Sequence, residues 1–575
     1  MKNFTARMQI LLILTLIALS HCAIFAQGKA AKIDELVKGY HGFGQFNGAV
    51  LVAEKGRVIY KKGHGLANME WKIANHPDTK FRLGSITKQF TAALILQLVE
   101  QGKVKLDGKL TDYLPDYRQD TGGKITIHQL LNHTSGIPSY TDQPGFFENV
   151  SRNPFTVSEM VKKYCSGDFE FEPGTKYAYN NSGYFLLGAI VEKVTGKTYE
   201  QALNENIFGP LGMKDSGYDN HDPLIERRAT GYTKVGKGYE NSAYLDMSIP
   251  YAAGSLYSTV EDLYLWDQAL YENKVLTAAS KALMFKPGLD NYGYGFVIAN
   301  ASLSDGKTKV PTIVHGGGIN GFNTLLTRLV SDRHVVILLD NTSQGQHLGP
   351  LTTAITNILY DQKYTLAKRS IGETLFDTIG TSGIKAGIDQ YRSLKSKGDA
   401  TYNFEEAELN TLGYRLLRTG KAPEAIEIFM LNIEMFPKAA NPLDSLAEAY
   451  LAGGHRDLSL ATYKKALAID PNFPSSLEAV KRLEVPVVAV DPNTLSQYAG
   501  QYELAPNFVI TVTVENGKLY GQATGQQRFE LEPAGPINFK IPVVGAEVTF
   551  VKGDNGKISA LILDQGGRKM EAKRL

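Results

Sequence analysis

The sequence contains only two cysteines, Cys22 and Cys165, among its 575 residues. Cys22 lies in an N-terminal leader, and the single thiol that remains beyond the leader cannot form an internal disulfide. We therefore interpret Cys165 as a small buried hydrophobic residue rather than a nucleophile. The spacings of histidine and carboxylate residues also give no convincing metal site, so we expect no metal or other cofactor.

The chain also lacks an excess of charge, with 61 basic and 59 acidic residues. Two of the basic residues, Lys2 and Arg7, lie in the leader, which has no acidic residue. The rest of the chain is balanced, so it shows no electrostatic footprint for nucleic acid, and we expect no such partner. Its 43% hydrophobic and 21% charged residues are typical of a soluble globular protein, and the length predicts two to four domains.

An apolar run over residues 10–20 is too short to span a bilayer comfortably. It follows a basic start and precedes the small residue Ala26, which is the layout of a secretory signal peptide over residues 1–26. We expect a secreted or periplasmic product. Attachment of a lipid to Cys22 is the open alternative, although His21 stands where a small residue normally precedes such a cysteine.

The tetrad Ser85-Ile86-Thr87-Lys88 opens an apolar segment that predicts a helix with Gly102 as its C-terminal cap. Residues three apart share one face of a helix, so Lys88 can lie within reach of the Ser85 hydroxyl. A serine hydroxyl needs such a neighbouring base before it becomes a good nucleophile. No Gly-x-Ser-x-Gly elbow surrounds Ser85, which argues against an α/β-hydrolase.

Two further motifs follow in order, Tyr179-Asn180-Asn181 and His315-Gly316-Gly317. Together, Ser-x-x-Lys, Tyr-x-Asn and His/Lys-x-Gly resemble the motifs of class C β-lactamases, DD-peptidases and family VIII esterases, a group of serine hydrolases. The resemblance covers residues 32–365. It extends to three other blocks, Leu130–Ile137, Pro210–Met213 and Gly254–Thr259.

This resemblance implies a role for each motif residue. Ser85 would be the acylated nucleophile, at a helix start whose dipole favours developing negative charge. Lys88 and Tyr179 are the candidate bases, and the sequence leaves open which of them takes the serine proton first. Nearby cations are expected to shift the phenol of Tyr179 toward phenolate. Asn181 would hydrogen-bond both Lys88 and the acyl-side amide of the substrate.

The third motif would form an edge strand beside the nucleophile. Gly317 would let the substrate approach the backbone, and the amide of Gly318 would join that of Ser85 in an oxyanion hole, where each donor is worth roughly 3 kcal/mol of barrier. β-Lactamases of this group normally carry Lys where this chain has His315. A neutral imidazole holds a substrate carboxylate less firmly than an ammonium group at pH 7, which argues against a dedicated β-lactamase.

Two other segments imitate catalytic motifs. Glu406–Asn410 resembles the deacylation motif of class A β-lactamases, but it follows the third motif and lies in a helical region. We interpret it as a solvated helix start. His133–Gly136 looks reactive, yet in the family that the chain resembles this block is a structural turn.

The resemblance implies an α/β (α+β) domain of the β-lactamase/transpeptidase type over residues 32–365. The sequence predicts an early hairpin, a late hairpin and a following helix, over residues 49–53 with 58–60, 324–330 with 334–339, and 351–360. In that fold the two hairpins join in one antiparallel sheet, and a helical lobe fits the middle of the region, from Ser85 to about Asn273. Such a fold would bring the three motifs into one cleft.

Residues 372–485 are predicted to be helical and to repeat. Six positions recur after 34 residues, namely Leu412, Leu416, Gly420, Phe429, Ile433 and Pro437, matched by Leu446, Tyr450, Gly454, Tyr463, Leu467 and Pro471. This pattern resembles tetratricopeptide repeats, which would offer a surface to a partner protein. Two clear repeats are few for an independent array, so the helices around residues 384–391 could add a degenerate third. An ordinary helical linker domain is the alternative.

A Pro-bounded linker over residues 486–492 leads into short alternating strands. Asn516-Gly517 and Asn555-Gly556 are strong hairpin turns between them. About eight strands in residues 493–575 predict a small antiparallel β-barrel, and we find no nucleophile or metal cluster in its sequence.

The combined pattern predicts a secreted serine hydrolase that acts through an acyl-enzyme on Ser85. Its substrates would be small amides or esters, including D-amino-acid peptides of the kind that peptidoglycan contains. Hydrolysis of β-lactams is the alternative for the substrate. The alternative from another class is a penicillin-binding or sensor module with little turnover, whose helical repeats recruit a partner protein.

Overall fold

The computed structural model describes residues 28–235, 238–484, 492–506, 508–526, 528–541, 544–553, 555–565 and 568–575. The predicted signal peptide, Cys22 and most of the predicted linker lie outside these residues. The chain divides into two compact units, Met1–Glu408 and Leu409–Leu575. The domain limits that the sequence suggests at residues 32, 365, 372, 485 and 493 stay predictions.

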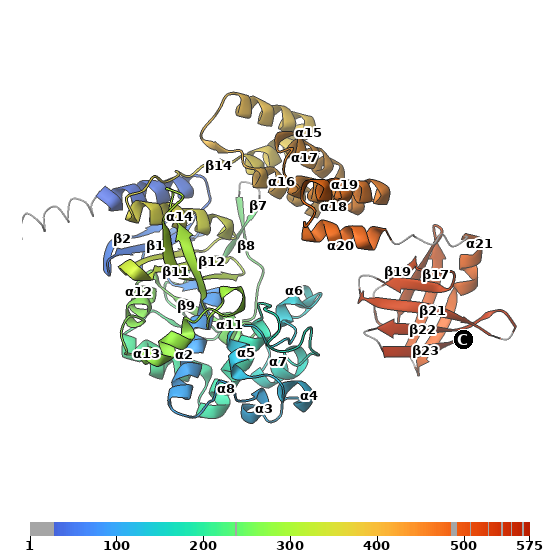
Figure 1. Cartoon of the computed structure of the whole chain (residues 1–575), viewed down its shortest axis with the longest axis horizontal. Coiled ribbons are helices and arrows are strands. Elements are labelled where there is room, and N and C mark those ends of the chain that lie inside the picture. The colour runs from blue at the N-terminus through green and yellow to red at the C-terminus, as the bar shows by residue number, and fades with distance from the viewer. Residues whose placement is uncertain are drawn as a thin grey trace, which may run out of the picture. The chain divides into compact units, whose positions relative to one another are not determined.

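An antiparallel sheet of six strands is the centre of the first unit (Figure 1). Its order is β10 (Val297–Ser302), β11 (Lys309–Ile319), β12 (Phe322–Leu329), β13 (His334–Asp340), β1 (Gly48–Glu54) and β2 (Arg57–His64). The pairing of β1 with β13 joins the early and late hairpins, as predicted. Lys55 and Gly56 both have positive φ in the β1–β2 turn, which is the geometry that a two-residue hairpin requires.

Helices cover both faces of this sheet. The first core cluster contains Ala49 and Leu51, whereas the second contains Val50 and Val52, because successive side chains of a strand point to opposite faces. From Gly48 to Ala53 the strand is therefore without polar side chains at every position rather than at every second one. Residues 28–42 form a helix that shares the second core with α14 (Leu348–Leu359), close to the predicted helix over residues 351–360.

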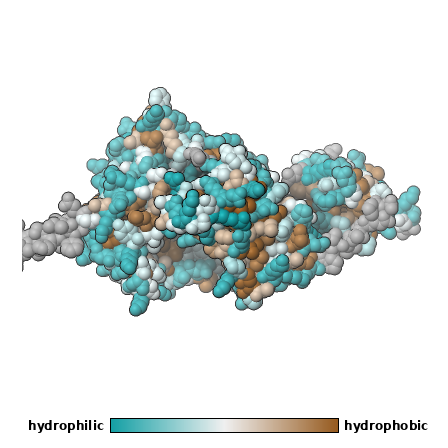
Figure 2. Space-filling view, turned by 90° about the horizontal axis from the view of Figure 1, so that it is seen from above, coloured by the Kyte–Doolittle hydropathy of each residue, from teal (hydrophilic) through white to brown (hydrophobic). Residues whose placement is uncertain are grey.

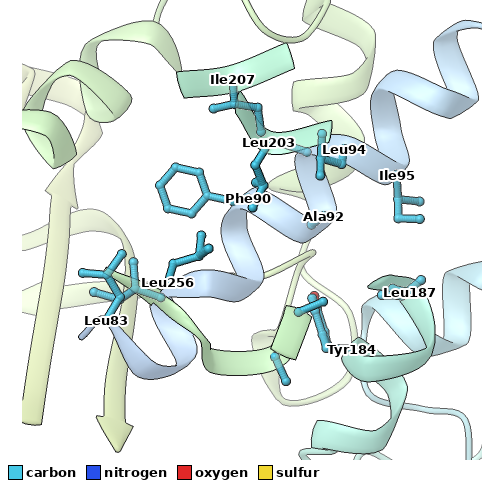
Figure 3. Packing of buried hydrophobic residues seen from close by; sticks show 14 of the residues in the cluster. Leu83, Phe90, Ala92, Leu94, Ile95, Tyr184, Leu187, Leu203, Ile207 and Leu256 are labelled. Carbon is cyan, nitrogen blue, oxygen red and sulfur yellow. The ribbon is translucent and has the colours of Figure 1, made fainter. Parts of the chain in front are cut away.

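The first core is dominated by the helical lobe, which lies between β2 and β10 in the sequence (Figures 1 and 3). Its two central helices, α2 (Thr87–Glu100) and α8 (Asn181–Thr195), are buried along most of their length. The other helices are α3 (Leu110–Tyr113), α4 (Gln119–Gly122), α5 (Ile127–Leu131), α6 (Phe146–Asn149), α7 (Val157–Tyr164), α9 (Tyr199–Leu203), α10 (Gly209–Leu211), α11 (Tyr251–Gly254), α12 (Val260–Ala269) and α13 (Ala278–Met284). In Figure 3, Phe90 of α2 lies among Leu203, Ile207 and Leu256.

Short strands connect the lobe to the sheet. They are β3 (Leu66–Asn68) with β4 (Ile73–Ala74), β5 (Phe81–Arg82) with β9 (Leu256–Ser258) and β6 (Gly217–Tyr218), and the hairpin β7 (Tyr232–Val235) with β8 (Gly238–Asn241). Arg369–Ser370 (β14) pairs in parallel with Tyr402–Asn403 (β15). Between them, α15 (Ile371–Ser396) is broken at Gly383, whose backbone is not helical.

The second unit begins with helices and ends in a closed eight-stranded antiparallel barrel. The helices are α16 (Glu406–Arg418, which starts in the first unit), α17 (Ala422–Met435), α18 (Asn441–Ala452), α19 (Arg456–Ile469), α20 (Pro474–Leu483) and α21 (Pro492–Leu495). The barrel strands are β16 (Gly500–Ala505), β17 (Phe508–Glu515), β18 (Lys518–Ala523), β19 (Arg528–Pro533), β20 (Asn538–Ile541), β21 (Ala546–Lys552), β22 (Ile558–Gln565) and β23 (Arg568–Arg574).

Two glycines explain part of the 34-residue pattern. Gly420 follows α16 and Gly454 follows α18, and both have the left-handed backbone that commonly ends a helix. Asn516 and Gly517 form the positive-φ turn between β17 and β18, as predicted. The glycines and the Asn-Gly pair that the sequence singles out thus lie at the ends of helices and in a turn of the barrel.

Hydrophilic residues cover most of the face seen in Figure 2, and hydrophobic residues reach the surface in separate places. In the described part of the chain, none of the helices is both long and apolar enough to cross a membrane. Cys165 is fully buried, and burial raises the pKa of its thiol to about 12, so it packs as a small hydrophobic residue.

Candidate active site

Ser85 lies in a single turn of 3-10 helix, Gly84–Ile86, that runs directly into α2. Gly84 has a φ of +55°, a conformation that favours glycine, and this bend turns the chain from β5 into the helix. Ser85 is half-buried and lines a cleft of about 520 Å³. The prediction of a serine at the start of an apolar helix is confirmed.

Lys88 is completely buried, one helical turn after Ser85. Its Nζ lies within hydrogen-bond distance of three oxygen atoms, Ser85 Oγ at 3.0 Å, Asn181 Oδ1 at 2.7 Å and the Ala253 carbonyl at 2.9 Å. As a neutral amine it donates to Asn181 and Ala253 and can accept the proton of the Ser85 hydroxyl. All three oxygen atoms belong to neutral groups, so nothing among them stabilises an ammonium group by charge. Burial therefore lowers the pKa of Lys88 well below its usual value of 10.5, which favours the neutral amine.

The ring of Tyr179 packs over this amine. Lys88 Nζ lies 4.8 Å from the centre of the Tyr179 ring, which keeps 37% of its surface exposed. Burial raises the pKa of Tyr179 above its usual value, although a hydrogen bond from Ser85 acts in the opposite direction. The expected shift toward phenolate is wrong for the free protein, because a neutral Lys88 supplies no cation to offset desolvation.

Asn181 is held from both sides at the start of α8. Its Oδ1 accepts from Lys88, and its Nδ2 donates to Thr141 Oγ1 at 3.0 Å. Asn180 caps the same helix by accepting from the Gly183 amide at 2.8 Å. The hydrogen bond to Thr141 therefore directs the Nδ2 atom of Asn181 away from Lys88 and leaves the Oδ1 atom facing it.

His315 lies on β11 and is only 6% exposed. Its Nδ1 donates to the Gly316 carbonyl at 2.6 Å, and its Nε2 accepts from the Tyr292 hydroxyl at 2.9 Å. Burial lowers the pKa of His315 to about 4, so the imidazole is neutral. The predicted contact of His315 with a substrate stays a prediction, because both ring nitrogens are used within the protein and the ring does not line the cleft.

The glycines of β11 press against the nucleophile segment. A Cβ atom on Gly317 would lie 1.9 Å from the Leu83 carbonyl oxygen, so the packing of the chain requires glycine here, and the approach of a substrate to its backbone stays a prediction. A Cβ atom on Gly84 would lie 2.9 Å from the Gly318 nitrogen. Gly318 and Ser85 both line the cleft, which is compatible with the predicted oxyanion hole formed by their amides.

Only the first part of β11 is paired on its outer side, since β10 pairs with residues 309–314. The motif that starts at His315 pairs with β12 alone among the described strands, as an edge strand would. The sequence thus predicted correctly that this segment lies beside the nucleophile turn.

Two residues around the site carried no recognised signal in the sequence, and a third, His133, was expected only as part of a structural turn. Tyr292 holds His315, and the Ala253 carbonyl accepts from Lys88. His133 packs against Tyr179 with ring centres 4.4 Å apart and accepts from the Asn180 amide at 3.0 Å. His133 has a φ of +60° and is buried, in keeping with the predicted structural turn.

The cleft belongs to a fold that is matched in known proteins. Residues 33–359 match the Beta-lactamase family, and residues 484–574 match a domain of unknown function (DUF3471). The first match covers more than half of the chain, so this protein belongs to the Beta-lactamase family.

Three relatives illustrate the range of that family. Esterase EstB of Burkholderia gladioli is 27% identical over 381 residues, covering 58% of this chain and 96% of the esterase. Teichoic acid D-alanine hydrolase of Staphylococcus aureus is 27% identical over 322 residues, covering 54% of this chain and 74% of the hydrolase. The structure of a penicillin binding protein from Bacillus halodurans has a TM-score of 0.50 and 28% identity, covering 56% of this chain and 98% of that chain. The fold and these relatives support a β-lactamase-related hydrolase.

Proposed function

We propose that this protein is a serine hydrolase that cleaves small esters or amides through an acyl-enzyme on Ser85. The observation that carries the proposal is the buried Lys88 amine, which lies 3.0 Å from the Ser85 hydroxyl and pairs with no carboxylate among the described residues. A desolvated lysine with a lowered pKa is a base that can operate near neutral pH.

In acylation, Lys88 takes the Ser85 proton as Oγ attacks the substrate carbonyl. The amides of Ser85 and Gly318 would stabilise the oxyanion, and the start of α2 adds its dipole there. The proton then returns through the Tyr179 hydroxyl to the leaving group, which departs as a neutral alcohol or amine. A protonated, neutral Tyr179 suits this relay, because its raised pKa keeps the hydroxyl proton in place until Lys88 replaces it.

In deacylation, a water molecule loses a proton to Lys88, directly or through Tyr179, and attacks the acyl carbonyl. The Ser85 oxygen then leaves and recovers its proton from Lys88, which restores the starting state. In each attack step Lys88 becomes positive while the oxyanion on the substrate becomes negative, and the proton that is returned at the end of each half-reaction restores the neutral Ser85, Lys88 and Tyr179 set. The site therefore needs no group beyond these side chains and water for a complete cycle.

Steady-state hydrolysis of a 4-nitrophenyl ester tests the proposal. We expect repeated turnover, so that the nitrophenolate released exceeds the enzyme concentration many times over. Release of one equivalent followed by a stop would contradict it, and would support a penicillin-binding or sensor module with little turnover. Lys88→Met serves as the matched inactive control, because it keeps the length and burial of the side chain without the base.

We further propose that the helices of the second unit are tetratricopeptide-like and that the protein is exported. The recurrence of Gly420 at Gly454, each after a helix, supports the first idea, and the leader supports the second. Mass analysis of the mature N-terminus tests export, with Gln27 as the expected first residue. A lipidated Cys22 at that terminus would instead support the anchored form.

A further inference from the structure

The cleft beside Ser85 is lined by twenty residues, and none of these is acidic or basic. The nearest ionisable side chain of the mechanism, Lys88, lies beneath the lining and is fully buried. The cleft has a volume of about 520 Å³. A site that binds a charged substrate usually carries a side chain of opposite charge in its lining, and the described lining of this cleft has none.

Lys234, the cation next to the lining residue Thr233, is engaged elsewhere. Its Nζ pairs with Glu373 at 2.7 Å and donates to the Gly44 carbonyl at 3.1 Å. The charged residues beside the lining at Asp142 and Glu148 are exposed and acidic. Among the described residues, a substrate carboxylate would therefore find no cation in the lining itself.

The lining has two kinds of surface. The apolar wall consists of Tyr140, Phe147, Leu245, Ile249 and Pro250. Its two segments are tied together because the Asp246 amide donates to the Ser151 carbonyl at 2.9 Å. Phe147 keeps 45% of its surface exposed, so a substrate can bury it further.

The polar wall consists of Thr233, Ser242, Asn320, Asn323 and Ser343. Its members are linked by hydrogen bonds of their own: Thr233 Oγ1 lies 2.7 Å from Ser242 Oγ, and Asn320 Nδ2 donates to the Ala243 carbonyl at 2.8 Å. Hydroxyl and amide groups retain further donor and acceptor capacity toward a ligand. This wall is built to bind uncharged polar groups.

We propose that the cleft selects substrates that are uncharged on both sides of the reacting carbonyl, with an apolar group on one side and a hydrogen-bonding group on the other. The proposal rests on the proposed function and names its substrate class. A carboxylate that enters the cleft loses hydration and gains no cation in return, which makes its binding unfavourable. A neutral hydroxyl or amide loses less and is compensated by the polar wall.

Matched ester pairs test this selection. The first pair is 4-nitrophenyl butyrate and 4-nitrophenyl hemisuccinate, in which a carboxylate replaces the terminal methyl group of the acyl chain. The second pair is phenyl acetate and 3-carboxyphenyl acetate, which places the charge on the leaving group. We expect kcat/KM to be at least about tenfold higher for the neutral member of each pair, because the desolvated carboxylate is unpaired.

Two variants add a cation at the cleft. Ala243 lines the cleft at an exposed position, so Ala243→Lys is tolerable, and Ala243→Met is its uncharged control. Asn320→Lys is the second variant. We expect the lysine variants to raise kcat/KM for the anionic esters relative to the neutral ones by about fivefold, an effect that high salt removes.

The outcomes separate this inference from the proposed function. Equal or faster hydrolysis of the anionic esters by the wild-type protein, abolished by Ser85→Ala, would overturn the inference and leave the proposed function standing. Absence of hydrolysis for all four esters, with no acylation of Ser85, would overturn the proposed function. A gain with Ala243→Met equal to that with Ala243→Lys would also overturn the inference, because the effect would not depend on charge.

Discussion

The Lys88 Nζ atom lies between Ser85 Oγ and Asn181 Oδ1, 3.0 Å from the first and 2.7 Å from the second. The shorter bond is thus to a neutral amide at a position where a carboxylate would make a salt bridge. Because its partner is neutral, Lys88 is buried without a counter-ion. Its pKa is therefore lowered, and it can act as the base that catalysis requires.

The first prediction concerns the base itself. Lys88→Arg should lose at least about a thousandfold in kcat/KM, because a guanidinium group stays protonated and cannot accept the serine proton. This substitution keeps a cation at position 88 but removes the base, so a loss of activity is expected even if the positive charge is retained. Measurement needs only ester hydrolysis and a circular dichroism spectrum. Activity of Lys88→Arg near that of the wild type would show that Lys88 acts only as a fixed positive charge.

The second prediction concerns pH. Activity requires neutral Lys88, so kcat/KM should be low at acid pH and should rise to a plateau as the amine loses its proton. Because burial lowers the pKa of Lys88, this rise should be complete well below pH 10.5. Asn181→Asp places a carboxylate 2.7 Å from the amine, which should move the midpoint upward by roughly one to three pH units.

A pH–rate profile of both proteins decides the matter. The same midpoint in wild type and Asn181→Asp would mean that the titrating group is not Lys88. Asn181→Ala is the control, because it removes the hydrogen bond without adding a charge.

The sequence predicted this site unevenly, for physical reasons. The contact between Ser85 and Lys88 is local, since residues three apart on a helix lie on one face, and it was predictable. Tyr292 and the Ala253 carbonyl reach the site only through tertiary folding, and no local pattern announces them. The predicted shift of Tyr179 toward phenolate was wrong because motif spacing does not reveal desolvation, which raises the pKa of Tyr179 and lowers that of Lys88.

The fold shows the same division. The apolar run of β1 and the positive-φ turn at Lys55-Gly56 are encoded locally, so the early hairpin was predictable. The pairing of β1 with β13, almost three hundred residues later, followed from the family resemblance rather than from any local pattern. The close approach of Gly317 to Leu83 was not predictable, because the two residues are far apart in the sequence and meet only in the folded chain.

The third prediction follows from that contact. Gly317→Ala forces a Cβ atom against the Leu83 carbonyl oxygen, which lies two residues before Ser85. We expect a destabilisation of about 1–3 kcal/mol and a loss of acylation, because the nucleophile turn must shift. Gly349→Ala is the matched control, since nothing lies within 4 Å of a Cβ atom at that helical position. Thermal unfolding and probe labelling of both variants measure the two effects, and an unaffected Gly317→Ala would contradict the packing described.

The fourth prediction concerns architecture. All the motif residues lie in the first unit, so a chain that ends after Lys368 should keep the cleft. This truncation removes Glu373, the ion-pair partner of Lys234, and we expect at most a modest loss of stability. Acylation by a small activated ester should persist. A truncated protein that is folded but cannot be acylated would show that later residues contribute to the site.

If Ser85 is the nucleophile, a fluorophosphonate probe should modify it, and mass mapping of the treated protein locates the adduct. We expect one adduct per chain, on the peptide that contains Ser85, and no adduct or hydrolysis in a folded Ser85→Ala variant. An adduct on another residue, or wild-type turnover in Ser85→Ala with an unchanged circular dichroism spectrum, would contradict this role of Ser85.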